Sequence, residues 1–514
     1  DFGVGNLLMD FAELSIYDSA LPAAKIAELF LSGNYSQNLA PPFDRAEWLG
    51  IKALAIGKNK PGDAMKNWCS LASDDSSDII HRLLAATKCN DAPLLSKLLE
   101  NPQTPAFLKM KYNVKGFAKH ACRLGGTQNN ELPQKRVYVS SSGLDSGDGS
   151  DFAPFASLER ARAEVHRLRD NGFKGRIAVI LASGTYLCTK PLNLDASDSN
   201  VVYAAKPGNA PVILQGGIRS NWSDFKKVAD MSTLARIPEE ARGKVFVADV
   251  HLGDYKLPPQ GSYGVGESPR SVLLLSANDT ALLNSARWPN QGFLTSTNRI
   301  NAEANTIGIE TNRAARWKSA GSLMAHGYWM YTWADAALPI SIQGTNGNWS
   351  LKLSKPHTYG IGKTPHFFVF NLLEELDEPG EWFFDSATSR LYLIPPEGTP
   401  PDYVTLTALA EPFITISGAN NVEFRGLSFR NARGDAVRVR QSQNAVFSGC
   451  DFRCIGGTAL DATGCPGLIV RDSSFRNLGH DGIIADAGNR RTLESGNIQI
   501  HNNKFSKVGQ SAHT

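Results

Sequence analysis

Three aspartates near the end of the chain have a spacing that could support acid–base chemistry on a sugar. Asp435, Thr458 and Asp481 follow one another at intervals of 23 residues, and Asp461 comes three residues after Thr458. If 23 residues make one structural repeat, the first three side chains share a column. Strands of neighbouring repeats lie about 4.8 Å apart, so the outer two carboxyl groups would be about 9–10 Å apart. Hydrolysis of a glycosidic bond needs two carboxyl groups, about 5 Å apart for retention or about 6.5–9.5 Å apart for inversion.

Other side chains of suitable type could bind a sugar beside these aspartates. His480 directly precedes Asp481, and the forked guanidinium groups of Arg490 and Arg491 could hold an anionic sugar. Aromatic faces stack on sugar rings, and the tryptophans considered for this role are Trp329, Trp333 and Trp382. The candidate catalytic residues are Asp481, Asp461 and Asp435, the candidate substrate-binding residues are His480, Arg490, Arg491 and Trp333, and no metal ligands are predicted. For each residue the alternative is a structural role, as a turn carboxylate, a surface side chain or a core ring.

A column of phenylalanines shows the repeat that the aspartates follow. Phe429, Phe452 and Phe475 are 23 residues apart, and Phe505 follows after a step of 30. The seven extra residues fall in or beside residues 487–496. A fixed period of this length without a helical pattern is typical of a solenoid, in which stacked coils bury a shared core. The Leu-rich spacing that a leucine-rich repeat needs is missing, so the pattern predicts a right-handed parallel β-helix.

The chain upstream of the repeat is expected to complete a mainly β protein. Residues 136–240 are predicted to form an N-terminal cap and the first coils, with one helix starting at Leu158 that covers the open end of the stack. Residues 241–400 are rich in tryptophan and proline and contain short β-like runs, which indicates an inserted β-sandwich. Residues 401–514 hold the repeating coils. The expected fold is therefore a right-handed parallel β-helix with an inserted β-sandwich, preceded by a small α-helical domain.

Two further segments come before the β-helix. Paired leucines and isoleucines at helical spacing predict an α-helical spacer domain over residues 35–126. Apolar residues alternate over residues 12–16, and a helical pattern follows. The string over residues 9–30 resembles the closing strand and helix of a laminin-G-like, concanavalin-type β-sandwich, so residues 1–34 are expected to be the remnant of such a domain. We expect a chain truncated at both ends.

Composition and charge argue against two classes of function. The 514 residues include 53 Lys and Arg against 50 Asp and Glu, a formal net charge of +3, so the basic excess of a nucleic-acid-binding protein is missing. No apolar run approaches the ~18 residues of a membrane span. The seven cysteines form no CxxC pair, which signals neither a zinc site nor a disulfide framework, and we expect small buried hydrophobes.

Several strings between about residues 136 and 514 resemble a known group of proteins. They are VYVSSSGLD and PFASLERARAEV near the start, ARWPN and GF before the insertion, and NLLEELDEPGEWF within it. These strings resemble bacterial right-handed parallel β-helix enzymes that degrade polysaccharides, most closely glycoside hydrolase family 141, of fucosidase and xylanase type. The resemblance implies an extracellular or periplasmic glycan hydrolase without an organic cofactor. Asn489 stands where a family-like turn has an acid, and some catalytic carboxylates are expected in coils beyond residue 514.

Three functions stay open from the sequence. The first is a secreted glycoside hydrolase that acts on a complex plant or algal polysaccharide by a carboxylate acid–base mechanism. The second is a polysaccharide lyase on the same scaffold, which needs a Lys or Arg base near a uronate and often calcium; Arg490 and Arg491 keep it open. The third is a non-catalytic glycan-binding surface protein. The expected partner is a polysaccharide, with no nucleic acid and no membrane span, and the expected state is a monomer.

Overall fold

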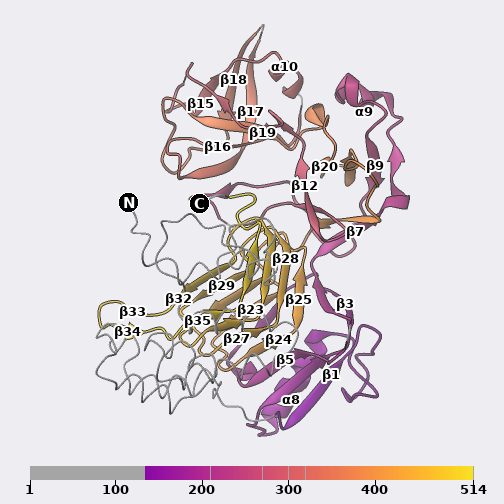
Figure 1. The fold of residues 1–514 in the computed structure, drawn as a ribbon, viewed down its shortest axis with the longest axis vertical. Helices are drawn as coiled ribbons and strands as arrows, with labels where there is room; N and C mark the ends of the chain where they lie inside the picture. Colours follow the sequence, from indigo (N-terminus) through magenta and orange to yellow (C-terminus); the bar gives the residue numbers. More distant parts are fainter. Residues whose placement is uncertain are drawn as a thin grey trace, which may run out of the picture. The chain divides into compact units, whose positions relative to one another are not determined.

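The computed structural model describes residues 133–512, except residues 209, 269, 299, 319 and 346. These residues belong to one compact unit of the chain, Glu131–Thr514 (Figure 1). The predicted laminin-G-like remnant, residues 1–34, and the predicted α-helical domain, residues 35–126, lie outside the described residues.

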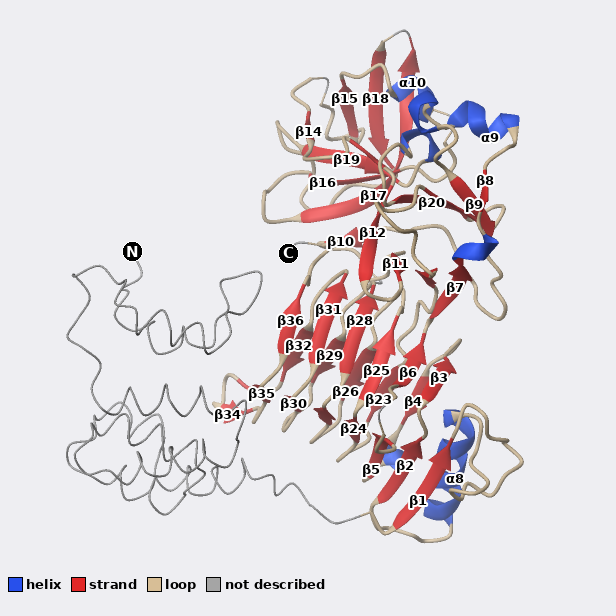
Figure 2. Ribbon diagram, turned by 45° about the vertical axis from the view of Figure 1, so that its right-hand side comes forward, coloured by secondary structure: helices blue, strands red, loops and turns tan. Residues whose placement is uncertain are grey.

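Three parallel sheets wind around a common core and form a β-helix (Figure 2). The first sheet contains, in spatial order, β1 (Lys135–Val139), β2 (Ile177–Leu181), β5 (Val201–Ala205), β24 (Glu423–Arg425), β27 (Val446–Ser448), β30 (Ile469–Arg471) and β35 (Gln499–His501). The second contains β3 (Gly184–Leu187), β6 (Val212–Gln215), β25 (Leu427–Arg430), β28 (Asp451–Ile455), β31 (Ser474–Leu478) and β36 (Lys504–Ser506). The third contains β4 (Leu192–Leu194), β23 (Ile414–Ser417), β26 (Val437–Arg440), β29 (Leu460–Thr463) and β32 (Ile483–Asp486). The mainly β fold with parallel coils is confirmed.

The predicted phenylalanine column is confirmed by the strand register. Phe429 pairs with Phe452, Phe452 with Phe475, and Phe475 with Phe505. Successive ring centroids lie 4.8, 4.9 and 4.8 Å apart with interplanar angles of 6°, 6° and 10°. These separations equal the spacing between neighbouring strands, so each coil places one ring directly over the next. Stacked aromatic pairs of this kind contribute about 0.5–1.5 kcal/mol each beyond the burial of their area.

The step of 30 residues corresponds to a hairpin in the last complete coil. The antiparallel strands β33 (Gly488–Asn489) and β34 (Glu494–Ser495) protrude between β32 and β35. The hairpin lies within residues 487–496, where the extra residues are predicted. Val470 still pairs with Ile500, so the insertion does not disturb the register of the core.

Helix α8 (Leu158–Asp170) packs at the N-terminal end of the coils, as the sequence predicts. The hydroxyl of Ser157 accepts a hydrogen bond from the backbone N–H of Arg160 and caps the first turn. Ala161 and Val165, one turn apart, are fully buried in the core of the β-helix. The helix therefore covers the apolar interior of the first coil, which would otherwise meet water.

The chain leaves the β-helix after β6 and returns at β23, and the excursion forms two mostly antiparallel sheets (Figure 1). The first contains, in spatial order, β7 (Gly217–Asn221), β22 (Tyr403–Thr407), β11 (Leu275–Ala277), β12 (Ala281–Ser285), β20 (Glu381–Asp385), β21 (Arg390–Leu393), β9 (Phe246–Asp249) and β8 (Lys226–Lys227). The second contains β13 (Arg287–Trp288), β19 (His366–Phe370), β16 (Met324–Tyr328), β17 (Asp335–Thr345), β18 (Asn348–Leu353) and β15 (Thr306–Ile309), with β10 (Tyr263–Gly264) on β17 and β14 (Leu294–Thr295) on β19. The excursion is longer at both ends than the expected residues 241–400, because β7 and β22 pair with each other.

The described residues also contain short helices around these sheets. They are α9 (Met231–Arg236) and α10 (Ala314–Trp317), and the 3₁₀ turns η2 (Ala196–Asp198), η3 (Trp222–Asp224), η4 (Glu239–Ala241) and η5 (Leu373–Glu375). The β-helix and the two inserted sheets have separate apolar cores.

Backbone hydrogen bonds fasten the inserted region to the β-helix. The N–H of Val272 donates to the carbonyl of Arg433 at 2.9 Å. The Arg433 guanidinium, itself buried, donates to the carbonyls of Pro258 and Pro259 at 2.6 and 2.8 Å. Burial lowers the pKa of Arg433 to about 10. At Gly456, a Cβ would lie 2.2 Å from the Val272 carbonyl, so only glycine permits this approach. The join lies beside the loops that carry the predicted aspartate column.

Candidate active site

Asp435, Thr458 and Asp481 form one column, as their spacing predicts. The backbone N–H of Thr458 donates to Oδ1 of Asp435 at 2.9 Å. The Thr458 hydroxyl donates to Oδ2 of Asp481 at 3.3 Å. The three residues occupy the turns between the second and third parallel sheets in successive coils. Two coil spacings separate the aspartates by about 9.5 Å, at the wide end of the range for inverting hydrolysis.

The two aspartates of this column have different surroundings. Asp435 is buried and pairs with Arg438, whose Nη2 lies 2.7 Å from Oδ2. The side chain of Asp481 is 45% exposed. Arg270, from the inserted region, donates to the Thr458 hydroxyl at 3.3 Å, and its Nη1 lies 3.9 Å from Oδ2 of Asp481. Asp481 is therefore the carboxylate that an incoming molecule reaches, whereas Asp435 is held by its neighbours.

His480 lies beneath Asp481, against the inserted region. Its ring is buried and meets the ring of Tyr263 edge to face, with centroids 6.2 Å apart. Its Nε2 atom is buried and has no hydrogen-bond partner among the described residues. Burial lowers the pKa of His480, and the charge of Arg270 lowers it further. The carboxylates that oppose this shift are those of Asp481, Asp435 and Asp335. The imidazole is therefore neutral at pH 7.

The inserted region contributes a second polar group to this junction. Nε2 of His326 on β16 lies 2.8 Å from Oδ2 of Asp335 at the start of β17. The His326 ring lies 5.8 Å from the ring of Tyr263, which in turn contacts His480. Burial raises the pKa of Tyr263, and the charge of Asp335 raises it further, so the phenol stays protonated. Together these contacts place the rings of His480, Tyr263 and His326 and the carboxylate of Asp335 next to the aspartate column.

Among the three tryptophans considered, Trp333 has its ring in solvent. Its side chain is 56% exposed, stacks on Tyr331 with centroids 5.5 Å apart, and meets Tyr359 edge-on at 5.1 Å. Trp329 and Trp382 are buried, and each donates its indole N–H to a backbone carbonyl. These two rings occupy cores of the inserted sheets, whereas Trp333 lies on the β16–β17 connection, two residues before Asp335.

Asp461 is not part of the aspartate column. It lies on β29, where both of its oxygens accept from Arg440 at 2.9 and 2.6 Å and Oδ1 also accepts from the hydroxyl of Thr463. The carboxylate is buried, and a bidentate pair of this kind occupies most of its acceptor sites. The carboxylate of Asp461 is therefore bound by Arg440 and Thr463 on the outer side of the third sheet, away from Asp435 and Asp481.

Arg490 and Arg491 also lie away from Asp481. They occupy the exposed turn of the β33–β34 hairpin. Strand β32 separates Asp481 from Asp486, and five residues of strand span about 16 Å. The cation beside Asp481 is therefore Arg270 of the inserted region, and not Arg490 or Arg491 of the hairpin.

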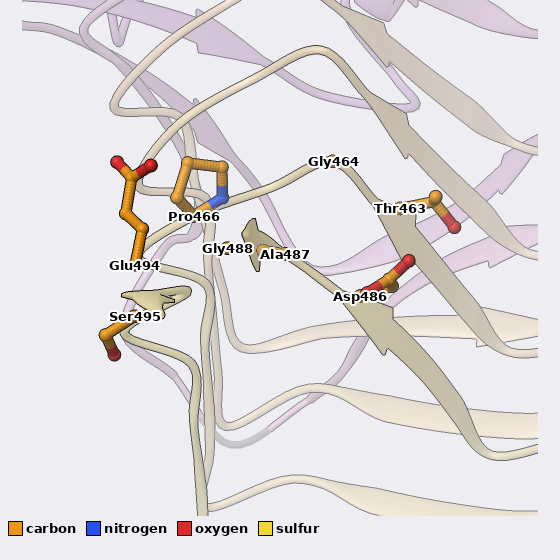
Figure 3. A pocket seen from close by; sticks show the side chains of 8 residues that line it. All are labelled: Thr463, Gly464, Pro466, Asp486, Ala487, Gly488, Glu494 and Ser495. Atoms are coloured by element: carbon orange, nitrogen blue, oxygen red, sulfur yellow. The ribbon is translucent and has the colours of Figure 1, made fainter. Parts of the chain in front are cut away.

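A pocket of about 380 Å³ lies beside the hairpin (Figure 3). Its lining residues are Thr463, Gly464, Pro466, Asp486, Ala487, Gly488, Glu494 and Ser495. Figure 3 shows Asp486 next to Thr463 on one side and Glu494 on the other. Asp435, Thr458 and Asp481 are not among these lining residues, so the pocket is distinct from the aspartate column.

Several acidic side chains of residues 371–383, the string NLLEELDEPGEWF, are hydrogen-bonded or paired within the inserted region. Glu374 pairs with Arg236 at 2.7 Å, and Glu375 accepts from the indole N–H of Trp317 at 2.6 Å. Burial raises the pKa of Glu381 to about 8, although backbone N–H groups at Asp377, Glu378 and Arg287 donate to it and oppose the shift. These carboxyl groups are enclosed within the inserted region, which indicates a structural role.

One group in the described part of the chain has the side chains of a metal site, namely His166, Asp195 and Asp198. Arg162 donates to both carboxylates, at 2.8 Å to Asp195 and 3.0 Å to Asp198. The N–H of Asp195 and Nε2 of His166 occupy further acceptor positions of Asp198. The cluster ties helix α8 to the turn η2, and the guanidinium takes the position that a cation would need.

Two further observations concern residues outside the site. Cys450, Cys454 and Cys465 are buried free thiols, consistent with the expectation of small buried hydrophobes. Burial raises the pKa of Cys450 and Cys454 to about 12, so both stay protonated. Over the described residues, none of the helices has the length and apolar character needed to cross a membrane.

Sequence reasoning identified the column and missed its partners from the insertion. Arg270, Tyr263, His326 and Asp335 join the site from residues that are 100 or more positions away from Asp435. No periodicity relates these residues to the coils, so no signal in the sequence could have paired them.

Comparisons with known proteins agree with this architecture. A family profile described as "Right handed beta helix region" matches residues 412–508, which include the whole aspartate column. A solved structure named "Glycoside hydrolase" has a TM-score of 0.59 and 19% identity, over 73% of this chain and 74% of the other. Another, named "The complex structure of XylC with xylose", has a TM-score of 0.31 and 9% identity, over 73% of this chain and 54% of the other. No curated protein matches the sequence. The described part of the chain is therefore a right-handed parallel β-helix with an inserted region, a fold that it shares with a solved glycoside hydrolase.

Proposed function

We propose that the protein is a glycoside hydrolase that cleaves a polysaccharide at the Asp435–Thr458–Asp481 column. The observation that carries the proposal is the unequal pair of carboxylates in one column, one buried and one open, next to a cation from the inserted region. The likeness in fold to a solved glycoside hydrolase supports the same class of reaction.

In this proposal Asp481 acts on the substrate directly. The Asp481 side chain is partly exposed and contacts Arg270 and the Thr458 hydroxyl, so it is placed to remove a proton from water. Asp435 supplies the second carboxyl group, about two coil spacings away, and in this proposal it gives a proton to the departing glycosidic oxygen. That separation leaves room for a water molecule between carboxylate and sugar, which favours inversion of the anomeric configuration.

Three further residues have supporting roles in the proposal. His480, neutral and buried, packs behind Asp481 and keeps its turn in place. Trp333, with Tyr331, offers an exposed aromatic face on which a sugar ring can stack. The substrate is a complex plant or algal glycan, and the protein works outside the cytoplasm, as the family resemblance implies.

A polysaccharide lyase is the second candidate, and the position of Arg270 favours it. Arg270 is partly exposed beside Asp481, where an arginine could neutralise a uronate carboxylate. Lyases of this kind often use calcium.

One assay separates the candidates. The full chain is incubated with a panel of plant and algal polysaccharides, and both new reducing ends and ultraviolet absorbance of unsaturated sugars are followed. Reducing ends without absorbance support the hydrolase. Absorbance of an unsaturated product supports the lyase. Binding of a glycan without either product contradicts both and leaves a glycan-binding surface protein.

A further inference from the structure

Three arginines form a ladder on the outer face of the second parallel sheet. Arg430 on β25 pairs in register with Arg453 on β28, and Arg453 pairs with Arg476 on β31. Neighbouring strands are about 4.8 Å apart, so three positive charges are stacked one per coil. We call Arg430, Arg453 and Arg476 the arginine ladder.

A single carboxylate serves all three arginines. Asp451 lies two residues before Arg453 on the same face of β28, and its oxygens are 3.1 Å from Arg453, 3.3 Å from Arg476 and 3.9 Å from Arg430. The hydroxyls of Ser428 and Ser474 also donate to Asp451. Two carboxylate oxygens have about four acceptor positions, so Asp451 has no capacity for further donors.

The ladder retains donors that the described residues do not satisfy. The Nε atoms of Arg453 and Arg476 are buried and have no hydrogen-bond partner within the described chain. Each guanidinium carries five N–H donors, so three of them present far more donors than one carboxylate accepts. Burial lowers the pKa of Arg430, and the charge of Arg453 lowers it further. Three guanidinium groups share one carboxylate, so positive charges outnumber their partners on this sheet.

The surroundings add to the positive charge. Beside Arg430, Arg219 pairs with Asp279 at 3.3 Å and lies over the ring of Tyr403. Asp451 pairs in register with Ser474, and Ser474 pairs with Lys504 in the following coil, so Lys504 adds a positive charge at this position. Four guanidinium groups and one ammonium group therefore face two carboxylates along this surface.

The ladder is distinct from the aspartate column. Each ladder arginine precedes a column residue by five positions in its own coil, as Arg453 precedes Thr458. The turn between β11 and β12 lies over the corner that separates them, where Asn431 donates to Asp279 and Asn477 donates to the carbonyl of Thr280. The ladder thus lies on another face of the coil, and its role does not depend on the proposed catalysis.

We propose that the arginine ladder binds the anionic groups of an acidic polysaccharide, either sulfate esters or uronate carboxylates. Arginine forks bind such oxyanions through two parallel hydrogen bonds. A linear acidic glycan that runs along the axis of the β-helix meets one guanidinium per coil, and its anions accept from the parts of these groups that reach solvent, since the three side chains are 16%, 17% and 40% exposed.

The test measures binding of the full chain to dextran sulfate, polygalacturonate and neutral dextran by titration calorimetry at two salt concentrations. The test variant is Arg453→Gln with Arg476→Gln. The control is Arg471→Gln, which removes one exposed positive charge from a different parallel sheet. Thermal unfolding of the parent and of the double variant is also measured with and without inorganic sulfate.

We expect the parent to bind one of the two acidic polymers at least tenfold more tightly than neutral dextran, and less tightly at high salt. The double variant should lose at least tenfold in affinity, and Arg471→Gln less than twofold. Sulfate should raise the melting temperature of the parent more than that of the double variant.

Preference for dextran sulfate identifies sulfate esters as the ligand groups, and preference for polygalacturonate identifies uronates. Binding of neither acidic polymer overturns the proposal, as does equal affinity of the double variant and the control. If the double variant fails to fold, Arg453→Lys decides: it keeps the charge and removes the fork, so weaker binding supports the proposal and unchanged binding overturns it.

Discussion

Nη1 of Arg270 lies 3.9 Å from Oδ2 of Asp481, and this ion pair joins the inserted region to a turn of the β-helix. Arg270 also donates to the Thr458 hydroxyl, which donates to Asp481 in turn. The exposed carboxylate of the column is therefore positioned from two sides, by its own neighbouring coil and by a segment that lies outside the coils.

Arg270→Gln should lower activity and leave stability nearly unchanged. Loss of the guanidinium removes a contact that positions Asp481 and the Thr458 hydroxyl, so we expect kcat to fall about tenfold. A pair between partly exposed groups contributes about 0–1 kcal/mol to stability, so the melting temperature should change little. Arg390→Gln, which breaks an exposed ion pair with Asp249, is the matched control and should keep full activity. Equal activity of the two variants would contradict this role for Arg270.

Trp333→Ala should weaken substrate binding without slowing the chemical step. Loss of one stacking face costs about 0.5–1.5 kcal/mol, which corresponds to a roughly 2- to 12-fold increase in KM. The control is Phe152→Ala, because Phe152 is a fully exposed ring in the cap region. An unchanged KM for Trp333→Ala, or an equal effect of both substitutions, would show that the exposed aromatic face does not hold sugar.

His480 should make the protein less stable in acid. Its pKa in the folded state lies below the unfolded value of about 6.5, so the unfolded state binds more protons between these two values. The contribution is complete above pH 6.5 and is lost as the pH falls through the folded pKa. His480→Gln should reduce the slope of unfolding free energy against pH by up to about 1.4 kcal/mol per pH unit.

Urea unfolding at pH values between 5 and 8 measures this slope. His501→Gln, at an exposed position on β35, should keep the slope of the parent. The pKa of His357 is also lowered by burial, so part of the slope should persist in His480→Gln. Parallel curves for the parent and His480→Gln would refute the assignment.

The phenylalanine column should dominate the stability of the coils. Phe452 is fully buried between Phe429 and Phe475, so Phe452→Ala should lower the unfolding free energy by about 3–5 kcal/mol. Phe505 is 48% exposed at the end of the column, so Phe505→Ala should cost clearly less. Urea denaturation of both variants gives the comparison, and an equal or larger loss for Phe505→Ala would speak against a column that is most tightly packed at its centre.

The coils could be predicted because residues that contact each other in neighbouring coils are separated by one fixed repeat length. One number, the period of 23 residues, places Phe452 over Phe429 and Thr458 between two aspartates. The hairpin could be located for the same reason, because the period lengthens by seven residues at one point. In a solenoid each coil contacts only its neighbours, so sequence separation translates directly into space.

The partners of the column could not be predicted because they come from outside this register. Arg270 reaches Asp481 only through the packing of the inserted sheets on the turns of the coils. Asp461 was a reasonable candidate by type, but Arg440 in the preceding coil takes both of its oxygens. Such pairings depend on the direction of each side chain and on the path of the inserted region. No repeat or spacing in a single sequence indicates either of them.

The most direct test of the account is the activity of Asp481→Asn, measured as reducing ends released from a polysaccharide that the parent cleaves. The amide keeps the shape of the side chain and removes its charge, so kcat should fall about 10²- to 10⁴-fold with an unchanged melting temperature. Asp486→Asn, five residues later on the exposed end of β32, should retain the activity of the parent. If Asp481→Asn keeps more than a tenth of the parental kcat, the carboxylate at the head of the column is not the catalytic group.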